Sequence, residues 1–314
     1  MNKIKERSLQ IIGVAGTLAC VAIFIHEPSF PTPDKLIVFL LFVFMIFRQA
    51  GEMLRRLLPF VVLIIVYESF RGLAHRLNSH VNYTLAPHID KALFGNLPTV
   101  YLQRWLWHGH VQWYDFVLYI PYLLFFVLPI SLALLVWKTR EHYYWQVVTS
   151  YMTLFFAAFL TFLVFPTAPP WLASQQHYIQ PIVRTSSYVW ASLGIHDFPS
   201  LYNHLAANPV AAVPSLHSAC ATLLAIFIFK LYGRRWGLVS LIYPALIYVG
   251  VIYEGEHYAF DVIAGIIYAV GAYYAGPYVL SYVQRLGHSA SKNIKKLKRA
   301  PVVPKALNYQ RDND

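Results

Sequence analysis

Charged side chains are scarce in this sequence. Asp, Glu, Lys and Arg together make up 12% of the chain, whereas a soluble domain carries about 25%. Hydrophobic residues make up 58%, and so few charges cannot cover a water-exposed surface. The composition therefore disfavours an ordinary cytosolic enzyme, a disordered protein and a nucleic-acid-binding module.

Cysteine is also scarce, because the chain has only Cys20 and Cys220, each within an apolar run. Two such residues make neither a disulfide framework nor a metal-binding spacing, and they are expected to pack as small hydrophobic side chains. His108, His110 and His177 have no carboxylate or Cys partner at the spacing of metal ligands. The sequence therefore predicts no metal site and no cofactor.

Long apolar runs are abundant instead. A helix that crosses a bilayer needs about 20 mostly apolar residues. We predict an all-α, polytopic membrane helix bundle with about eight transmembrane helices, at residues 8–25, 35–52, 57–75, 112–137, 143–165, 213–231, 236–254 and 257–280. The second run is the weakest, because its uninterrupted apolar core is short. The first resembles a signal peptide, but no small-x-small cleavage site follows it, so a retained anchor helix is expected.

The basic residues predict the orientation of these helices. If the N-terminus is cytoplasmic and all eight runs span, 19 of the 25 Lys and Arg residues lie inside and six lie outside. Cytoplasmic loops carry the excess of Lys and Arg in membrane proteins, so both termini are predicted to be cytoplasmic. The net charge of +11 is then mostly a consequence of topology. The basic C-terminal tail is expected to lie on anionic lipid headgroups, not on nucleic acid.

Two long loops, at 76–111 and 166–212, fall on the extracytoplasmic side. Loops of this length are usually functional or disordered. Both are rich in aromatic residues, His and Pro, and neither is of low complexity. The extracytoplasmic side is therefore where we expect the functional site.

The first informative motif is the segment 253–265, which reads YEGEHYAFDVIAG. His257 and Asp261 are four residues apart, so they are expected to lie on one face of a helix. A carboxylate there can accept the Nδ1 hydrogen of the imidazole, which fixes the tautomer and leaves Nε2 as a nucleophile. The alternative is a structural His–Asp pair that holds helices together.

The second motif is the segment 211–218, which reads AAVPSLHS. Pro214 and Ser215 are a helix-start signal, and the N–H groups of a helix start suit a phosphate. Ser215 adds a hydroxyl group, and His217 can act as a general acid for a leaving alkoxide. The alternative for His217 is a polar side chain at the headgroup level. Because both motifs open helices on the same side of the membrane, a shared catalytic site is predicted.

Together the two motifs resemble the type 2 phosphatidic acid phosphatase superfamily. More narrowly, they resemble the branch that contains fungal inositol-phosphorylceramide synthase and bacterial relatives. Weaker similarity extends upstream, so that the resemblance covers roughly residues 60–280. The upstream segments are FPTAPPW at 165–171, DKALFGNLPT at 90–99 and YESFRGLA at 67–74.

The resemblance implies a six-helix catalytic core at 57–280, preceded by two membrane helices at 1–56 and followed by a basic cytoplasmic tail at 281–314. It also implies a lipid phosphoester substrate. By that pattern His257 is the nucleophile that forms a phosphohistidine, Asp261 orients it, His217 protonates the leaving group and Ser215 binds phosphate. The phosphohistidine route needs no metal.

The sequence departs from the superfamily pattern in its basic residues. The superfamily has a Lys and an Arg-Pro pair near 160–170, where this chain has FPTAPP, and an Arg where this chain has Val251. The developing phosphoryl charge still needs cations. Arg71 is the first candidate, since it closes the third predicted span on the active side, and Arg184 and Arg104 follow. The alternative for each is an arginine that snorkels to the headgroups.

Glu254 and Glu256 flank Gly255 just before His257. They are either solvated turn carboxylates, or one of them binds a polyol or sugar hydroxyl of an acceptor. A carboxylate beside a phosphate would otherwise repel it.

The main functional hypothesis is an integral membrane lipid phosphotransferase or phosphatase. The branch resemblance favours transfer of a phosphoinositol-type headgroup to a polyol or lipid alcohol. One alternative is a plain phosphatase of phosphatidic acid or polyprenyl phosphate. The other is a non-enzymatic lipid-binding or transport protein, which would leave His217, His257 and Asp261 without a role.

Overall fold

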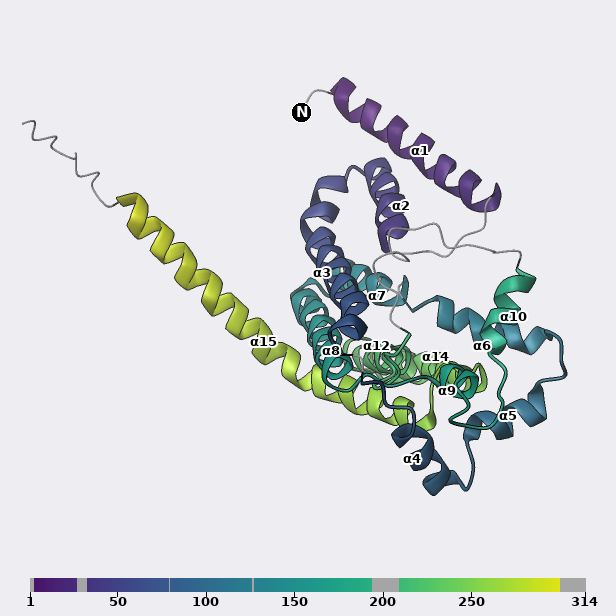
Figure 1. Cartoon of the computed structure of the whole chain (residues 1–314). Helices are drawn as coiled ribbons and strands as arrows, with labels where there is room; N and C mark the ends of the chain where they lie inside the picture. The colour runs from purple at the N-terminus through teal and green to yellow at the C-terminus, as the bar shows by residue number, and fades with distance from the viewer. Residues whose placement is uncertain (1–2, 27–32, 79, 126, 194–208, 300–314) are drawn as a thin grey trace, which may run out of the picture.

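The structure is a computed structural model that describes residues 3–26, 33–78, 80–125, 127–193 and 209–299 (Figure 1). Helices account for most of these residues, and the only β pairing among them is two isolated bridges. The predicted all-α fold class is confirmed. The helices that contain the apolar runs are α1 (Lys3–His26), α2 (Pro33–Ile46), α3 (Ala50–Leu77), α6 (Trp113–Leu123), α7 (Val127–Thr139), α8 (Tyr144–Val164), α12 (Leu216–Tyr232), α13 (Arg234–Ser240), α14 (Ile242–Tyr253) and α15 (Ala259–Arg299).

Several of these helices have the length and composition to cross a membrane, so the chain is an integral membrane protein. Four segments of the described chain qualify: Arg7–His26, Glu141–Val164, Arg234–Tyr253 and Ala259–Gly287. A fifth is added if α6 and α7, which meet at 56°, form one broken span.

The expected count of about eight full spans is therefore not reached among the described residues. The helices Lys35–Ile46 and Leu216–Tyr232 are apolar but shorter. The third expected run lies within α3, but the side chains of residues 68–77 are outside the described part. The last expected run lies within α15, which continues through Pro277 to Arg299. The predicted tail therefore begins as helix, and residues 300–314 lie outside the described residues.

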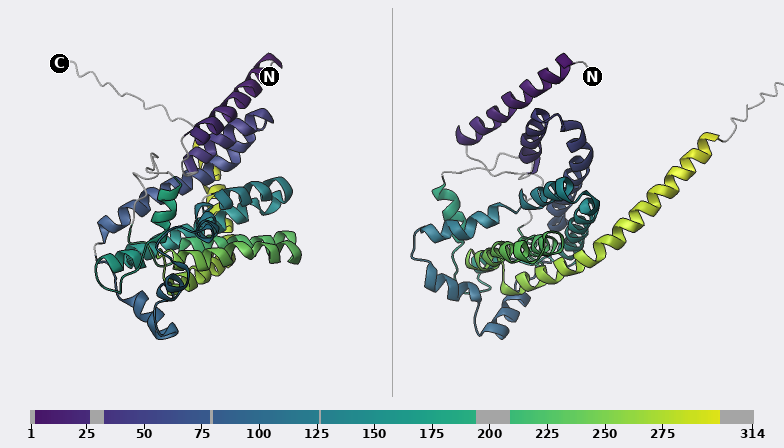
Figure 2. Two further views of the ribbon diagram at one scale, coloured as in Figure 1. Left: turned by 90° about the vertical axis from the view of Figure 1, so that its right-hand side faces the viewer. Right: turned by 180° about the vertical axis from the view of Figure 1, so that it is seen from behind.

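The main hydrophobic core joins α3, α7, α8, α12 and α15. Large side chains with almost no exposure fill it, among them Phe60, Tyr151, Phe162 and Phe227. The helices α1 and α2 pack against each other at the edge of this bundle (Figures 1 and 2), and many apolar side chains of α1 are exposed. Apolar side chains therefore face outward, which would be unfavourable in water but suits contact with lipid.

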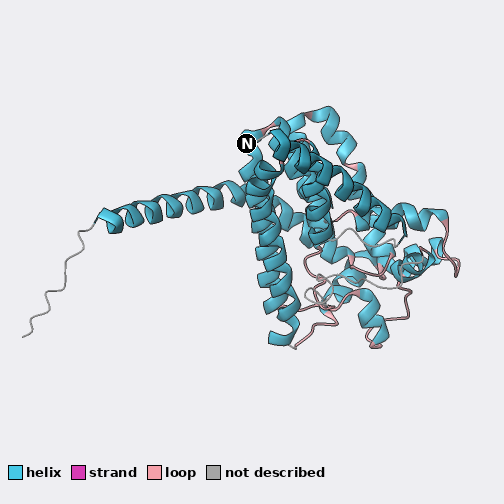
Figure 3. Cartoon of the chain, turned by 90° about the horizontal axis from the view of Figure 1, so that it is seen from above, coloured by secondary structure: helices cyan, strands magenta, loops and turns pink. Residues whose placement is uncertain are grey.

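Polar contacts gather the loops into two groups. At one end, Arg56 forms an ion pair with Glu141, and Lys138 donates to Gln49 at 2.6 Å. At the other, the two long loops contain α4 (Leu85–Phe94), α5 (Pro98–Leu106), α9 (Pro170–Gln175) and α10 (Thr185–Ser192). Most loops of the described chain lie on the side away from the far end of α15 (Figure 3). This is the grouping that the charge pattern predicts, and the choice of the cytoplasmic end stays a prediction.

Candidate active site

The position of His217 is set by the start of α12. Ser215 is the N-cap residue, and its side-chain oxygen accepts a hydrogen bond from the Ser218 backbone N–H at 3.4 Å. The Ser218 hydroxyl also donates to that oxygen, at 3.1 Å. Serine is a preferred N-cap because its oxygen satisfies an N–H of the first turn that has no partner within the helix. The predicted helix start is confirmed, and it places His217 in the first turn.

The position of His257 is set by a tight turn between α14 and α15. Gly255 has a φ of 74°, which glycine adopts without strain. A Cβ atom there would lie 3.2 Å from the Val183 carbonyl oxygen, so the turn has little room for a side chain. α15 begins at Ala259, two residues after His257. The expectation that His257 and Asp261 share one helix face is therefore wrong, because His257 still belongs to the turn.

His257 and Asp261 nevertheless meet. Nδ1 of His257 lies 3.4 Å from Oδ2 of Asp261, a long hydrogen-bond contact, and both side chains are buried. The same carboxylate oxygen accepts a hydrogen bond from the Tyr258 backbone N–H at 2.9 Å. Asp261 is the third residue of α15, so its side chain reaches back over the helix start, as the acidic residue of a capping box does. The contact uses Nδ1, so Nε2 is the ring nitrogen on the side away from Asp261.

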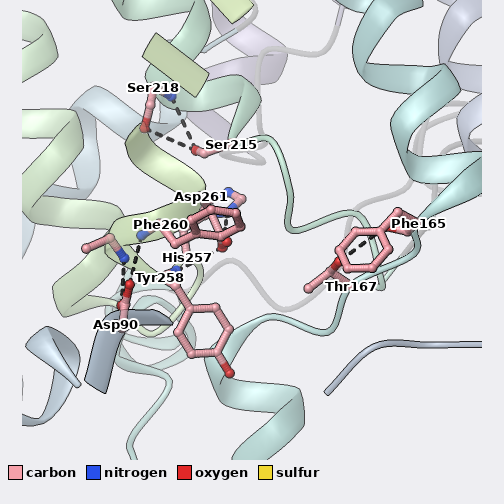
Figure 4. A network of polar contacts seen from close by, with 10 residues as sticks. Asp90, Phe165, Thr167, Ser215, Ser218, His257, Tyr258, Phe260 and Asp261 are labelled. Atoms are coloured by element: carbon pink, nitrogen blue, oxygen red, sulfur yellow. Dashed lines mark hydrogen bonds and ion pairs between the residues drawn. The ribbon is translucent and has the colours of Figure 1, made fainter. Parts of the chain in front are cut away.

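The two motifs are in direct contact (Figure 4). The Ser215 backbone N–H donates to the Asp261 carbonyl oxygen at 3.0 Å. The helices approach closely there, since a Cβ atom on Gly265 would lie 2.4 Å from the Ser215 carbonyl oxygen. The ring centroids of His217 and His257 are 5.7 Å apart. The structure thus brings together four of the residues that the sequence singled out.

His217 lies among aromatic rings. The Tyr122 ring stacks on it at a centroid distance of 4.1 Å and an interplanar angle of 15°. The Phe125 ring lies 4.5 Å away in a tilted arrangement. Both residues belong to the α6–α7 segment, so this broken pair of helices fixes the plane of the imidazole.

Contacts from the two long loops hold the segment 253–261 in place. Asp90 of α4 accepts hydrogen bonds from the backbone N–H groups of Ala259 and Phe260, at 2.9 Å each. The Gln103 side-chain amide donates to the Tyr253 carbonyl oxygen at 2.8 Å. The Trp171 backbone N–H donates to the Gly255 carbonyl oxygen at 3.0 Å.

The same loops also hold each other. Gln103 binds the backbone of Val183 through both ends of its side-chain amide, at 2.6 and 2.9 Å. Thr167 forms isolated bridges with Asn82 on one side and Ala211 on the other. Segments from three parts of the sequence thus meet beside the two histidine motifs.

Glu256 and Arg184 form an ion pair next to the histidines. Nε and an Nη atom of Arg184 donate to the two carboxylate oxygens of Glu256, at 2.7 and 3.2 Å. The Ser186 hydroxyl donates to the same carboxylate at 2.6 Å, and the guanidinium lies 4.4 Å from the centre of the Trp171 ring. Burial disfavours the charge of Arg184, but the attraction and hydrogen bonds of Glu256 outweigh it and raise the pKa of the guanidinium.

Glu254 is placed differently. Its side chain is almost fully buried, and neither carboxylate oxygen has a hydrogen-bond partner in the part of the chain that the structure describes. Burial, followed by the nearby charges of Glu256 and Asp115, raises the pKa of Glu254 well above its usual range. Neither glutamate is therefore a solvated turn carboxylate, because one is paired with arginine and the other is sealed from water.

Of the two remaining basic candidates, only Arg104 has a described side chain, and it is not among the residues that contact the histidines. Arg104 lies on α5 with an exposed side chain, outside the contacts described above. Arg71 lies in α3, but its side chain is outside the described residues. Among the described side chains, no group of three or more His, Cys, Asp or Glu is arranged to hold a metal ion.

Sequence reasoning assigned no role to several residues that hold the site. Asp90 and Trp171 lie in segments that carried the family resemblance, but nothing in the sequence pointed to their partners. Gln103 and Tyr122 gave no signal at all, because a polar residue in a loop and a tyrosine in an apolar run are both common.

Comparison with known proteins identifies the family. The model of the PAP2 superfamily matches residues 87–275, which is more than half of the chain and includes both histidine motifs. No curated protein and no solved structure matches the chain. Members of the superfamily are phosphatases and phosphotransferases that act on lipid phosphates. The protein therefore belongs to the PAP2 superfamily, which is the type 2 phosphatidic acid phosphatase superfamily that its motifs resemble.

Proposed function

We propose that the protein is a lipid phosphotransferase or phosphatase in which His257 becomes phosphorylated during turnover. The observation that supports this most directly is the meeting of the buried His257 and Asp261 with the half-buried His217, at 5.7 Å between the imidazole centroids. A purely structural His–Asp pair would not need the second histidine.

In the first step, Nε2 of His257 attacks the phosphorus of a lipid phosphoester. A P–N bond forms as the P–O bond to the leaving alcohol breaks, and His217 supplies the proton that the leaving oxygen needs. Asp261 accepts the Nδ1 hydrogen, which keeps the lone pair on Nε2 and stabilises the positive charge that the ring acquires. The Tyr258 backbone N–H, bound to Asp261, keeps that carboxylate in place.

In the second step, a hydroxyl group attacks the phosphohistidine. His217 takes the proton from the attacking oxygen, a new P–O bond forms and the P–N bond breaks. If the oxygen belongs to water, the protein is a phosphatase. If it belongs to an alcohol, the protein is a transferase, and a water-excluding site favours that outcome.

The phosphate is proposed to bind at the start of α12. Backbone N–H groups and the positive end of the helix dipole point there, and Ser215 adds its hydroxyl. Arg184 is the proposed cation, since it forms an ion pair with Glu256, the residue that directly precedes His257. Arg71 and Arg104 stay secondary proposals.

An acceptor hydroxyl is proposed to bind near Glu254, not Glu256. The oxygens of Glu256 are already bound to Arg184 and Ser186, whereas those of Glu254 have no hydrogen-bond partner among the described residues. A raised pKa keeps the carboxyl of Glu254 protonated over a wider pH range, and a neutral carboxyl can both donate to and accept from a hydroxyl without repelling the phosphate. This supports transfer, for instance of a phosphoinositol-type headgroup, over plain hydrolysis.

The remaining assignments follow from the same proposal. The core at 57–280 would carry the chemistry, residues 1–56 would be an added membrane segment, and the basic residues after 281 would lie on cytoplasmic headgroups. Both termini would be cytoplasmic and the histidines extracytoplasmic.

The proposal is tested with the purified protein in detergent micelles. Labelled phosphatidic acid reports hydrolysis, and phosphatidylinositol mixed with a lipid alcohol reports headgroup transfer. We expect turnover of at least one substrate and an acid-labile, alkali-stable phosphoprotein that is absent from H257N. The matched control is H88N, an exposed histidine on α4. Turnover that persists in H257N would exclude the mechanism, and lipid binding without turnover would favour the carrier alternative.

A further inference from the structure

Asp90 is a buried carboxylate that binds the start of another helix. It lies on α4 with no exposed surface. Its Oδ2 accepts a hydrogen bond from the Ala259 backbone N–H and its Oδ1 from the Phe260 backbone N–H, at 2.9 Å each. These are the first two residues of α15, and they are 169 and 170 residues away in the sequence. The arrangement is visible in Figure 4.

The start of α15 needs this acceptor from outside. The first N–H groups of a helix have no partner within it, and a short polar residue just before the helix usually supplies one. Here the residue before the helix is Tyr258, whose side chain packs in a small hydrophobic cluster with Ala86, Leu97 and Ile179. Asp261 satisfies the Tyr258 N–H, and Asp90 satisfies the next two.

Asp261 and Asp90 therefore together satisfy the backbone N–H groups at the start of α15. Asp261 uses a single oxygen both for the Tyr258 N–H and for Nδ1 of His257. If the first turn of α15 frayed, this oxygen would lose its backbone donor and the orientation that goes with it. Asp90 prevents fraying by holding the two N–H groups between Tyr258 and Asp261 in the chain.

Asp90 also contributes charge. It is close enough to interact electrostatically with Asp261. Burial, then the charge of Asp261 and then that of Asp90, raises the pKa of the Tyr258 hydroxyl. Asp90 is thus electrostatically coupled to the carboxylate that contacts His257.

We propose that Asp90 is a positioning residue for the reaction at His257: it fixes the start of α15 so that Asp261 holds the imidazole. The inference rests on the proposed function of His257. It adds a residue from α4 to a site otherwise built from the two histidine motifs.

The test compares D90N and D90A with the wild type. The Asn side chain keeps one acceptor oxygen but removes the charge, whereas Ala removes both. E141Q is the control, because Glu141 is also a carboxylate in the first turn of a helix, but it pairs with Arg56 in the other group of loops. Phosphatidic acid in micelles is the turnover probe, and nuclear magnetic resonance of ¹⁵N-labelled histidine reports the His257 ring without turnover.

We expect D90A to lower kcat by about tenfold to 100-fold with little change in KM, because orientation is lost rather than binding. D90N should retain more activity than D90A. In both variants the ¹⁵N chemical shifts of the His257 ring should change, because Asp261 no longer holds Nδ1 in one orientation. E141Q should leave both kcat and the His257 signal unchanged.

Three results would overturn the inference. A folded D90N with wild-type kcat and a wild-type His257 signal would show that Asp90 only stabilises the fold, and this variant decides the matter if D90A does not fold. An E141Q that changes the His257 signal equally would remove the specificity. Equal activities of D90A and the wild type would exclude positioning. Failure of the proposed function would be seen separately. In that case H257N would turn over phosphatidic acid as fast as the wild type, or neither protein would turn it over. The ¹⁵N signal of His257 would still test the role of Asp90.

Discussion

The two histidines are held by different kinds of contact. His257 lies in a network of hydrogen bonds: Asp261 contacts its ring, and Asp90 and Gln103 bind the backbone on either side of it. His217 lies between the rings of Tyr122 and Phe125 instead. One ring is fixed by polar groups that select a tautomer, and the other is fixed by flat surfaces that constrain its plane.

The difference matches the roles that we propose for them. A nucleophile must present the same nitrogen in every turnover, and a carboxylate on the other nitrogen ensures this. An acid that later acts as a base must gain and lose a proton with little structural change. Stacking serves that purpose, because an aromatic face can accompany either protonation state, and the charged ring also gains from a cation–π contact.

The largest effect should come from removing the nucleophile. H257N should lower kcat by at least about 10⁴-fold, since residues that act as a unit lose nearly all their contribution together. The measurement is initial rate on phosphatidic acid, with H88N as the control for a histidine outside the site. Accumulation of phosphoprotein in H217N but not in H257N would identify His257 as the nucleophile and His217 as the acid. If H217N lost as much kcat as H257N and trapped no phosphoprotein, these two roles would not be distinguished.

A somewhat smaller effect is expected from D261N. An amide can donate to the imidazole where the carboxylate accepts, which stabilises the wrong tautomer, so kcat should fall by about 1000-fold. The side chain keeps its size, and its oxygen can still accept from the Tyr258 N–H. Circular dichroism checks that α15 is intact. An activity within a few-fold of wild type would show that the polar network of His257 is structural.

Substitutions of Tyr122 test whether the aromatic contacts of His217 matter for activity. Y122L removes the ring that stacks on His217 and should lower kcat by about tenfold, because the acid is no longer held in plane. Y122F keeps the ring and should be close to wild type. Equal losses in Y122L and Y122F would mean that the hydroxyl, and not the stacking, is what matters.

The comparison also separates what the sequence could predict from what it could not. The two motifs were predictable because their contacts join residues that are close in the sequence. Ser215 caps α12, as serine often does at a helix start. His257 contacts Asp261, although through the turn before α15 and not on one face of a helix. The number of full spans was less predictable. The helix Leu216–Tyr232 is shorter than a full span because it lies between its capping residues, and the length of the apolar run does not reveal this.

The supporting residues were out of reach of sequence reasoning for a physical reason. Asp90 and Gln103 bind backbone groups that are 80 or more residues away, and every residue type except proline has the same backbone N–H and carbonyl, so no sequence pattern reveals these partners. The pairing of Arg184 with Glu256 was missed for a similar reason, because each residue was considered for a ligand and not for the other. The catalytic roles themselves stay predictions.

The smallest expected effect concerns Glu254, which lies on the His217 side and interacts electrostatically with Tyr119 and Tyr122. Its pKa is raised by burial and by neighbouring carboxylates, so above the usual value of 4.5 the folded chain keeps a proton that the unfolded chain has released. Stability must then fall as the pH rises toward the folded-state pKa, by at most about 1.4 kcal/mol per pH unit from this group.

E254Q should flatten that slope, because glutamine resembles the protonated acid in shape and does not titrate. The measurement is the Tm in detergent from acidic to alkaline pH, with the exposed E52Q as the control. If E254Q and wild type lost stability in parallel, the buried carboxyl would not be the group that holds the proton. If E254Q kept hydrolysis but E254A lost only transfer to a lipid alcohol, the same residue would link stability to the choice of acceptor. The aromatic side of the site would then select the acceptor, while the polar side performs the phosphoryl transfer.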